Sequence, residues 1–480
     1  AYNSWNGIPM SIHPCLEEIT RKQWGNNGII CTDGGALKLL IEAHKSFPSF
    51  AEGAAAVVKA TTGQFLDAYV PYVKEALEKG LLTEVDIDKA IRGNIFVALK
   101  LGLLDGDHSR NPYLSIGKNS TETPPFMTAE ARRLAREVTA KSVVLLKNKK
   151  LLPLDAGKLR KIAVIGPYSD KIVQDWYSGT PPYETTILSG IRNAVKEGTE
   201  IIHAEDNRMG QAEKAAAAAD VAIVCVGNHP YGTRADWKFS PVPSDGREAV
   251  DRKSLMLPDE DLVKLVLKAN PNTILVLVSS FPYTINWSQE HVPAIVHITH
   301  CSQEQGNGLA DVLFGKVNPA GRTVQTWVKD ITDLPDIMDY DIRNGRTYMY
   351  HQGPVLYPFG YGLSYSDFAY EKIESFKQDK KNIRVTVSVK NTSGRDGEEV
   401  VQLYASYPES KVERPSKQLR AFRRIPIKAG ETRKVTLTVP KEELGYWNEG
   451  KQMFVVEPGT VKLLIGASSE DIRLEGKIRL

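Results

Sequence analysis

The first residue whose type and setting could do chemistry is an aspartate between an apolar run and two glycines. Residues 29–31 are Ile-Ile-Cys, Thr32-Asp33 follows, and Gly34 and Gly35 come next. A short apolar run between turn residues is typical of a buried parallel strand, and the apolar pattern that follows predicts a helix. Barrel enzymes keep their reactive groups at such strand ends, and the glycines leave room for a ligand. Alternatively, Asp33 only caps the helix.

Three short motifs around Asp33 resemble glycoside hydrolase family 3. Residues 2–9 read Tyr-Asn-Ser-Trp-Asn-Gly-Ile-Pro, and Trp24-Gly25 and Thr32-Asp33 lie further along the chain. In that family, the segment with the catalytic nucleophile reads roughly Tyr-Asn-x-x-Asn-Gly-x-Pro, then Trp-Gly-Phe, then Ser-Asp-Trp. The resemblance extends to the C-terminus of the chain. It implies that Asp33 is the nucleophile and that Tyr2 is the tyrosine beside it.

The chain departs from this family pattern at three positions. Asn26 stands where the family has Phe, Thr32 where it has Ser, and Gly34 where it commonly has Trp. That Trp helps to shape the sugar pocket in many relatives, so the resemblance leaves the preference between glucose and xylose open. Gly34 and Tyr2 are therefore our candidates for substrate binding next to the nucleophile.

Hydrolysis of a glycosidic bond needs a second carboxylic residue. In a retaining enzyme the two carboxyl groups lie about 5–5.5 Å apart. The segment from Asn228 to Leu257 is the candidate to carry it, because it is much longer than the usual strand-to-helix connection of about 2–6 residues. Its Tyr231 and Trp237 could stack on a sugar, or could only pack the loop onto its own domain.

Residues 248–255 supply the candidate acid. They read Glu-Ala-Val-Asp-Arg-Lys-Ser-Leu and resemble the family's Glu-Gly-x-Asp-Arg-x-x-Leu, whose Glu is the acid/base in many members. The resemblance implies that Glu248 protonates the leaving oxygen while Asp33 attacks the anomeric carbon, and that Glu248 then activates water. Asp245 is the alternative acid. Glu248 could also be a surface acid paired with a neighbouring arginine.

Composition and charge argue against several other classes of protein. The 61 Lys and Arg nearly balance the 58 Asp and Glu, which leaves a net charge of +3 and argues against nucleic-acid or polybasic membrane binding. No apolar run reaches the roughly 18 residues that a membrane helix needs. The spacing of the four cysteines predicts buried free thiols rather than a disulfide framework or a zinc site: Cys15, Cys31, Cys225 and Cys301.

The sequence predicts neither a cofactor nor a metal. Gly166-Pro167 follows an apolar run, but no Gly-x-Gly-x-x-Gly or Walker pattern surrounds it, which argues against dinucleotide or phosphate binding. His297 and His300 are three positions apart, and we interpret both as structural rather than as metal ligands.

Residues 1–117 are predicted to be the C-terminal part of a (β/α)₈ barrel. Because a complete barrel needs about 250 residues, the resemblance implies that much of the barrel, with most groups that hold the sugar's hydroxyls, is absent from this chain. A partial barrel exposes strand edges and apolar faces, so we expect a second polypeptide, or another cover, over them. The helical patterns of this part lie near 35–46, 50–60, 64–79 and 84–103.

Residues 118–345 are predicted to form an α/β sandwich that completes the active site. After a polar linker at the start, apolar runs alternate with helical patterns, which favours a parallel sheet with helices on both faces. The clearest runs are at 162–167, 221–227, 273–278 and 294–298, and the clearest helices at 128–142, 210–218 and 259–269.

Residues 346–480 are predicted to form a fibronectin-type-III-like β-sandwich. Alternating segments at 384–390, 433–439 and 460–465 are typical of short antiparallel strands. The stretch 357–365, Tyr-Pro-Phe-Gly-Tyr-Gly-Leu-Ser-Tyr, is similar to the entry of this domain in the family. The fold class is therefore α/β plus all-β: part of a barrel, an α/β sandwich and a β-sandwich.

The function that this resemblance implies is exo-acting hydrolysis of β-glycosides, with release of a terminal β-D-glucose from oligosaccharides or glycosides. A β-D-xylosidase of the same family is the first alternative. A catalytically dependent half, or a binding module that needs the rest of the barrel, is the second. The sequence begins inside a motif, without Met or a signal peptide, so localisation stays open and secreted or periplasmic sites are compatible.

Overall fold

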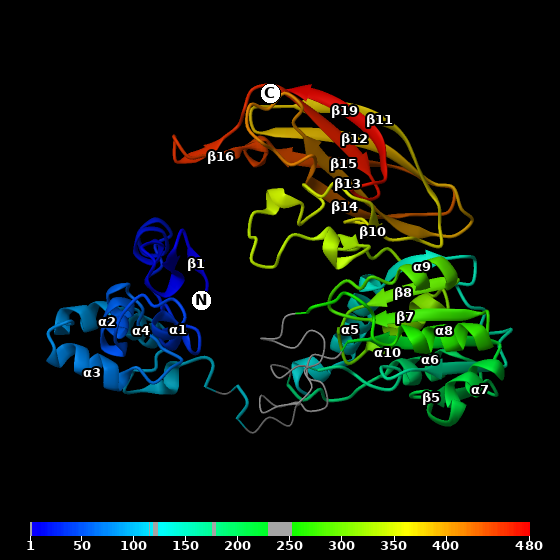
Figure 1. Cartoon of the computed structure of the whole chain (residues 1–480), viewed down its shortest axis with the longest axis horizontal. Coiled ribbons are helices and arrows are strands. Elements are labelled where there is room, and N and C mark those ends of the chain that lie inside the picture. The colour runs from blue at the N-terminus through cyan, green and yellow to red at the C-terminus, as the bar shows by residue number, and fades with distance from the viewer. Residues whose placement is uncertain (1, 115, 119–122, 175–178, 229–251) are drawn as a thin grey trace. The chain divides into compact units, whose positions relative to one another are not determined.

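The computed structural model describes residues 2–114, 116–118, 123–174, 179–228 and 252–480. The chain divides into two compact units, Ala1–Glu122 and Thr123–Leu480 (Figure 1). Asp33 belongs to the first unit. Among the described residues, no helix combines the length and the apolar character that a membrane crossing requires.

The first unit is mainly helical. Thr83 caps α4 through a reciprocal capping box with Asp86. The helix expected over 64–79 is shorter, because α3 begins only at Val70 and takes Pro71 into its first turn, where proline has no N–H bond to lose. The α-helices among its described residues are α1 (Ala36–Glu42), α2 (Phe50–Lys59), α3 (Val70–Glu78) and α4 (Glu84–Lys100).

The strand expected at residues 29–31 does not form. This run makes only one isolated parallel bridge, between Cys31 and Gln64, and Cys31 is exposed. A parallel strand is stable when other strands flank it. Within the described part of this unit, the only strand pair is the short antiparallel hairpin β1 (Ser4–Trp5) and β2 (Ile8–Pro9). The expectation of a buried strand before Asp33 was therefore wrong.

The second unit contains a six-stranded sheet in the order β3-β8-β7-β6-β4-β5. β6 and β7 are buried along their whole lengths, as continuous apolar runs predict. All neighbouring strands are parallel except β3, which runs antiparallel to β8 at one edge. The strands are β3 (Val144–Asn148), β4 (Lys161–Ile165), β5 (Glu200–Ala204), β6 (Val221–Gly227), β7 (Thr273–Val278) and β8 (Ala294–Ile298).

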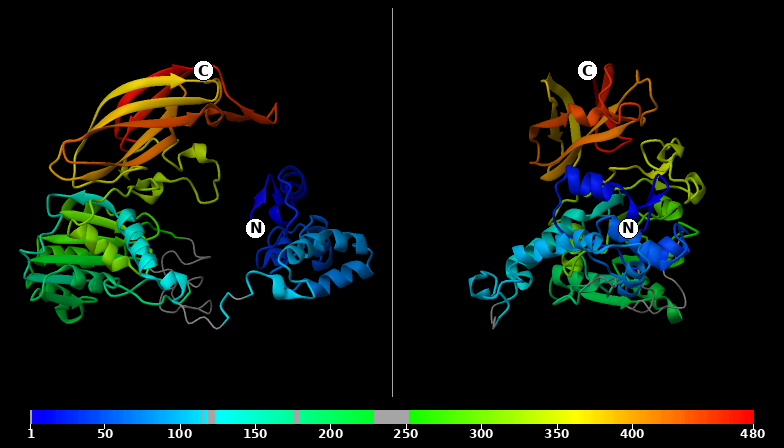
Figure 2. Two further views of the ribbon diagram at one scale, coloured as in Figure 1. Left: turned by 180° about the vertical axis from the view of Figure 1, so that it is seen from behind. Right: turned by 90° about the vertical axis from the view of Figure 1, so that its left-hand side faces the viewer.

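Helices cover both faces of this sheet, as predicted (Figures 1 and 2). One apolar core contains side chains of α5 (Ala129–Ser142), α6 (Ile187–Ala194) and α10 (Gln305–Leu313). The core on the opposite face contains side chains of α7 (Gln211–Ala217) and α8 (Glu260–Ala269). Trp287 of the short helix α9 (Asn286–His291) packs against the second core.

The C-terminal part is a β-sandwich, as its alternating sequence predicts. Its two sheets have the strand orders β11-β12-β15 and β14-β13-β18-β19, and alternate side chains from both fill one apolar core. The hairpin β16–β17 (Tyr446–Asn448 and Met453–Val455) projects from it. The strands are β11 (Phe368–Gln378), β12 (Asn382–Asn391), β13 (Gly397–Ser406), β14 (Gln418–Ile427), β15 (Thr432–Pro440), β18 (Thr460–Gly466) and β19 (Ile472–Arg479).

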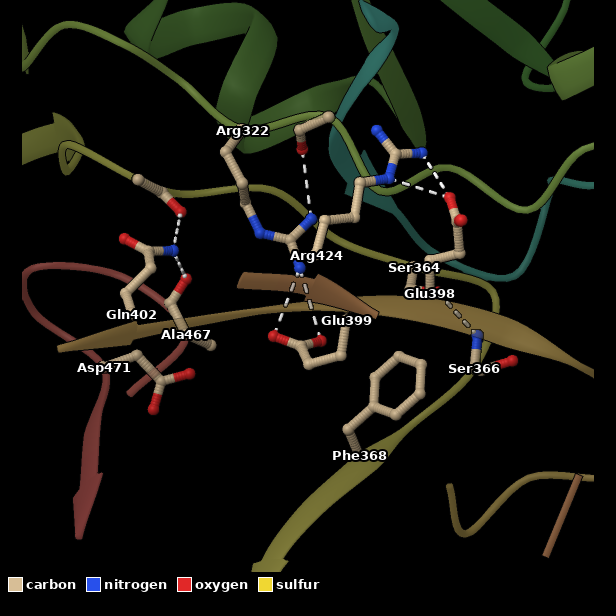
Figure 3. Close-up of polar contacts among 12 residues, drawn as sticks. Arg322, Ser364, Ser366, Phe368, Glu398, Glu399, Gln402, Arg424, Ala467 and Asp471 are labelled. Carbon is tan, nitrogen blue, oxygen red and sulfur yellow. Dashed lines mark hydrogen bonds and ion pairs between the residues drawn. The ribbon is translucent and has the colours of Figure 1, made fainter. Parts of the chain in front are cut away.

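Polar contacts join the sandwich to the α/β part of the second unit (Figure 3). The guanidinium of Arg322 lies 3.3 Å from the carboxylate of Glu399, and only 9% and 4% of the two side chains are exposed. Arg424 binds Glu398 and also donates to the carbonyl of Lys141, at 3.0 Å. These pairs connect residues far apart in sequence, and no sequence motif predicts them.

The segment that connects the α/β part to the sandwich carries one further pair of strands. β9 (Trp327–Val328) pairs antiparallel with β10 (Val355–Tyr357). The Tyr361 hydroxyl donates to the carbonyl of Leu146 in β3, at 3.1 Å. The aromatic stretch 357–365 therefore lies against the edge strand of the sheet before the sandwich begins.

Candidate functional site

Asp33 sits in a turn between the bridge to Gln64 and the start of α1. Its carboxylate is exposed and accepts one hydrogen bond among the described residues, from the backbone N–H of Gly34, at 2.9 Å. Its own backbone carbonyl, rather than its side chain, accepts the bond from Ala36 N. The carboxylate is thus available to a ligand from the solvent side.

A different carboxylate binds the free N–H groups at the start of α1. Asp67 accepts from Gly35 N at 2.5 Å and from Leu37 N at 3.5 Å. Helix N-termini have unpaired N–H groups that attract such an acid. The alternative that Asp33 merely caps this helix is therefore wrong in this structure. Sequence reasoning missed Asp67, because its partners lie about thirty positions away.

Tyr2 and Gly34, both proposed from the sequence, lie in direct contact. The Tyr2 hydroxyl donates to the backbone carbonyl of Gly34, at 2.5 Å. His44 Nε2 lies 2.7 Å from the Tyr2 carbonyl and attaches this residue to the end of α1. The N-terminal segment therefore reaches the residue next to Asp33, and the phenol ring stands at the edge of the candidate site.

Space is open at Gly34 itself. A Cβ atom built there would have no other heavy atom within 4 Å, and the backbone is not in the left-handed region. Gly35, by contrast, has φ +78°, a conformation that favours glycine. The position where the family commonly has Trp is thus unfilled in this chain.

Thr32 and Arg21 hold the loops on either side of Asp33. Thr32 is buried; its N–H donates to the carbonyl of Gln64, and its hydroxyl accepts from Leu66 N, at 3.2 Å. The guanidinium of Arg21 donates to the carbonyls of residues 26, 28 and 61. Neither residue could be predicted as a positioning group from the sequence, because these partners are backbone groups and no local motif indicates them.

The other candidates, Tyr231, Trp237, Asp245 and Glu248, lie outside the described residues. The structure does describe both ends of the segment that carries them. Asn228, at the first end, exchanges hydrogen bonds with Ser280, at 3.3 and 3.1 Å. Arg252, at the other end, donates to the carbonyl of Pro282 and stacks on the ring of Phe281, 3.8 Å from its centre.

The two residues that flank the undescribed stretch are therefore attached to one segment, residues 279–283, which directly follows β7. His297, which is half-buried, supports the segment, because its Nε2 lies 3.1 Å from both the carbonyl and the hydroxyl oxygen of Ser279. Burial lowers the pKa of His297 to about 4, so the ring is neutral at physiological pH. This arrangement fits the structural role expected for His297.

The described residues contain no group of three or more His, Cys, Asp or Glu side chains that could hold a metal ion. All four cysteines are free, as predicted, but only Cys225 is buried. Burial raises the pKa of the Cys225 thiol far above its usual range. The expectation of buried thiols was wrong for Cys31 and Cys301, which are exposed, and for Cys15, which is half-buried.

Two family models match parts of the second unit. The model of the glycosyl hydrolase family 3 C-terminal domain matches residues 143–365, which include the six-stranded sheet and its helices. The model of the fibronectin type III-like domain matches residues 399–469, within the β-sandwich. Both matches agree with the folds predicted for these regions.

Named relatives match nearly the whole chain. A periplasmic β-glucosidase of Salmonella typhimurium is 30% identical over 98% of this chain and 66% of its own length. A β-xylosidase of Formosa agariphila is 29% identical over 98% of this chain and 67% of its own. The chain thus spans about two thirds of the length of these relatives.

Solved structures of β-glucosidases are also similar to this chain. The chain is similar over its whole length to a β-glucosidase from Listeria innocua in complex with isofagomine, with a TM-score of 0.83, 27% identity and coverage of 67% of that protein. A β-glucosidase from Erythrobacter marinus gives a TM-score of 0.84 at 26% identity, again with 67% of that protein covered. With these matches in sequence and in fold, the chain belongs to glycoside hydrolase family 3.

Proposed function

We propose that this chain carries the catalytic carboxylates of a retaining β-glycoside hydrolase that releases terminal β-D-glucose. The observation that supports the proposal best is the setting of Asp33. Its carboxylate is exposed, is not used to cap α1 and lies beside the open space at Gly34. A nucleophile needs this freedom to approach an anomeric carbon. Several relatives of this chain are named β-glucosidases.

The proposed reaction is a double displacement. Asp33 attacks the anomeric carbon and forms a covalent glycosyl ester, while Glu248 donates a proton to the leaving oxygen. Glu248 then removes a proton from water, which attacks the same carbon and releases Asp33. In this mechanism Glu248 must keep its proton near neutral pH, which requires burial or the nearby charge of Asp33 to raise its pKa.

A β-D-xylosidase is the second candidate, because Gly34 stands where the family commonly has Trp and this departure leaves the sugar preference open. Relatives of comparable identity carry both names. The missing Trp side chain changes the wall of the proposed pocket, and a wall of this kind distinguishes sugars by small steric differences. The ratio of kcat/KM for aryl β-glucoside and aryl β-xyloside decides between the two activities.

We also propose that a further polypeptide segment, the remainder of a barrel, covers the first unit. Along α4, Ile91, Ile95 and Leu99 follow one another at four-residue spacing, and 37%, 46% and 57% of these side chains are exposed. The opposite side of the helix packs inward, with Ala90 and Gly93 buried. An exposed apolar stripe of this kind is typical of an interface that lacks its partner.

The decisive experiment measures hydrolysis of aryl β-glucoside and aryl β-xyloside by the chain alone and by its mixture with a barrel fragment. The fragment comes from the part of the Salmonella typhimurium β-glucosidase that this chain does not match. Activity in the mixture that disappears in Asp33→Asn supports the proposal. Activity of the chain alone contradicts the need for a covering segment. Sugar binding without hydrolysis in either sample favours the binding module over the hydrolase.

A further inference from the structure

A cavity of about 410 Å³ lies where the connecting segment meets the β-sandwich. Its walls come from residues 351–355 of the connecting segment and from the sandwich loops around Lys417 and Ser469. Its volume is within the range of small-molecule sites, about 300–1,000 Å³. All of these residues belong to the second unit, whereas Asp33 belongs to the first.

Three buried polar atoms in the walls of this cavity lack a hydrogen-bond partner among the described residues. They are Thr326 Oγ1, His351 Nε2 and Ser469 Oγ, and the Ser469 side chain is completely buried. A buried polar group without a partner destabilises the fold, because it has given up its hydrogen bond to water without gaining another. Three such atoms around one hollow indicate that a polar ligand completes their hydrogen bonds.

Two charged side chains that line the cavity, Lys417 and Glu470, already form an ion pair with each other. The ammonium of Lys417 donates to the Ser469 carbonyl at 2.6 Å and to the Glu470 carboxylate at 2.7 Å. His351 Nδ1 lies 3.3 Å from the Gly345 carbonyl, and in the tautomer that donates this bond from Nδ1 the other ring nitrogen, Nε2, is an acceptor. The polar groups that remain to bind a ligand are therefore two hydroxyls and one ring nitrogen. The lysine among the described lining residues is already paired with a carboxylate, so it does not favour an anionic ligand.

The walls of the cavity are held in place by neighbouring contacts. The ring of Tyr348 stacks on Phe359, with centres 4.3 Å apart, and its hydroxyl accepts from Leu419 N. Ser469 N donates to the Phe359 carbonyl, at 2.9 Å. The hollow is therefore preformed, and a ligand that enters it does not have to order a loop first.

From this chemistry we propose that the cavity is a second sugar site, which binds a neutral monosaccharide such as D-glucose or D-xylose. Each sugar hydroxyl both donates and accepts, so one molecule can satisfy the hydroxyls of Thr326 and Ser469 and the acceptor of His351. The site is independent of hydrolysis at Asp33. It holds a sugar on the sandwich side of the second unit.

The first test measures binding of D-glucose and D-xylose by calorimetry, with the full chain carrying Asp33→Asn so that no turnover occurs. Thr326→Val and Ser469→Ala each remove one unpartnered hydroxyl. Without sugar, these variants should be as stable as the parent or slightly more so, and their affinity for sugar should fall about tenfold. Thr386→Val is the matched control, because its hydroxyl pairs with Thr436 elsewhere on the sandwich.

A second variant blocks the cavity. A Cβ atom at Gly353 would lie 3.0 Å from His351 Nε2, and the backbone there is not left-handed. Gly353→Ala should therefore abolish sugar binding, whereas Gly394→Ala, where a Cβ has open space around it, should not. Unchanged affinity in the Thr326, Ser469 and Gly353 variants would overturn the proposal, as would the absence of any sugar binding by the parent.

Hydrogen exchange on the unsubstituted chain tests the proposed sugar site even if a variant fails to fold. Added D-glucose or D-xylose should slow exchange in peptides that cover 348–358 and 464–470. Protection confined to other regions would mean that the cavity holds only water. Stronger protection with inorganic phosphate than with either sugar would contradict a neutral ligand.

Discussion

The proposed chemistry depends on Asp33. Its side chain accepts only one hydrogen bond from the described residues, so it contributes little to the stability of the fold. We predict that Asp33→Ala, assayed with the barrel fragment, lowers kcat by three orders of magnitude or more, as removal of a nucleophile does in other enzymes. The midpoint of thermal unfolding should stay within a degree or two. Added azide should restore turnover and give a glycosyl azide, because the small anion fits the space of the lost carboxylate.

The matching change at the second acid separates its role from that of Asp33. We predict that Glu248→Gln slows substrates with poor leaving groups far more than activated aryl glycosides, because only the former need protonation of the leaving oxygen. The pH profile of kcat/KM should also lose its upper limb. Equal losses on both substrates would assign the proton donor elsewhere, with Asp245→Asn as the next variant.

Gly34 is predicted to control the sugar preference. Gly34→Trp should fold normally, because the space around the position is open. It should change the ratio of kcat/KM between glucoside and xyloside about tenfold or more, which is the usual effect of reshaping a pocket wall. Gly34→Ala controls for the loss of backbone freedom. A ratio that does not change with Trp would place the specificity in another part of the pocket.

At the scale of the element, the start of α1 depends on Asp67. We predict that Asp67→Ala destabilises the first unit by about 1–2 kcal/mol, because it leaves the N–H groups of Gly35 and Leu37 without their carboxylate. Asp33→Ala, one turn away, should cost much less. Amide exchange of residues 35–40 compares the two variants directly, and equal acceleration in both would contradict this division of roles.

The segment after β7 should be sensitive to pH through His297. Its pKa is about 4 in the folded chain because burial disfavours the charged ring, against about 6.5 when unfolded. The unfolded chain therefore binds the proton first as pH falls below 6.5. Between pH 6.5 and pH 5 the folded state should lose about 2 kcal/mol.

Thermal unfolding at pH 7 and pH 5 measures this loss. In His297→Gln the additional loss at pH 5 should disappear, whatever the variant's stability at pH 7. An identical pH dependence in both proteins would mean that other groups dominate the acid response.

A helix or strand can be predicted from the sequence when its own residues determine it, and not when contacts with distant segments do. β6 and β7 are found in full because a buried central strand reads as one apolar run. β5 was missed, because this edge strand is only partly buried and carries Glu200 and His203. The antiparallel direction of β3 could not be predicted either, because an apolar run does not indicate the direction of its strand.

The candidate site was predictable only where short motifs exist. Asp33 and Tyr2 could be proposed because each lies in a recognisable motif, and the structure brings Tyr2 to Gly34. Asp67, Thr32 and Arg21 act through partners that are distant in sequence or belong to the backbone. The pairing of Arg322 with Glu399 is of the same kind. Such contacts are set by the fold, and no local pattern encodes them.

At the scale of the whole molecule, the junction between the α/β part and the sandwich contains a buried ion pair. We predict that Glu399→Gln destabilises the second unit by about 3–5 kcal/mol, because Arg322 keeps a buried charge without its carboxylate. The double variant Arg322→Met with Glu399→Leu should recover most of this loss. Limited proteolysis between residues 345 and 368 reports on the junction, and equal stability of the single and double variants would contradict the argument.

The attachment of Asn228 and Arg252 to one short segment after β7 has a consequence for engineering. Asn228 bonds to Ser280 and Arg252 to the carbonyl of Pro282, at the same strand exit. Between two fixed ends, doubling the length of a connecting segment raises its closure free energy by only about 0.6 kcal/mol. We therefore expect insertions between these two residues to leave the six-stranded sheet intact, as long as both attachments are kept.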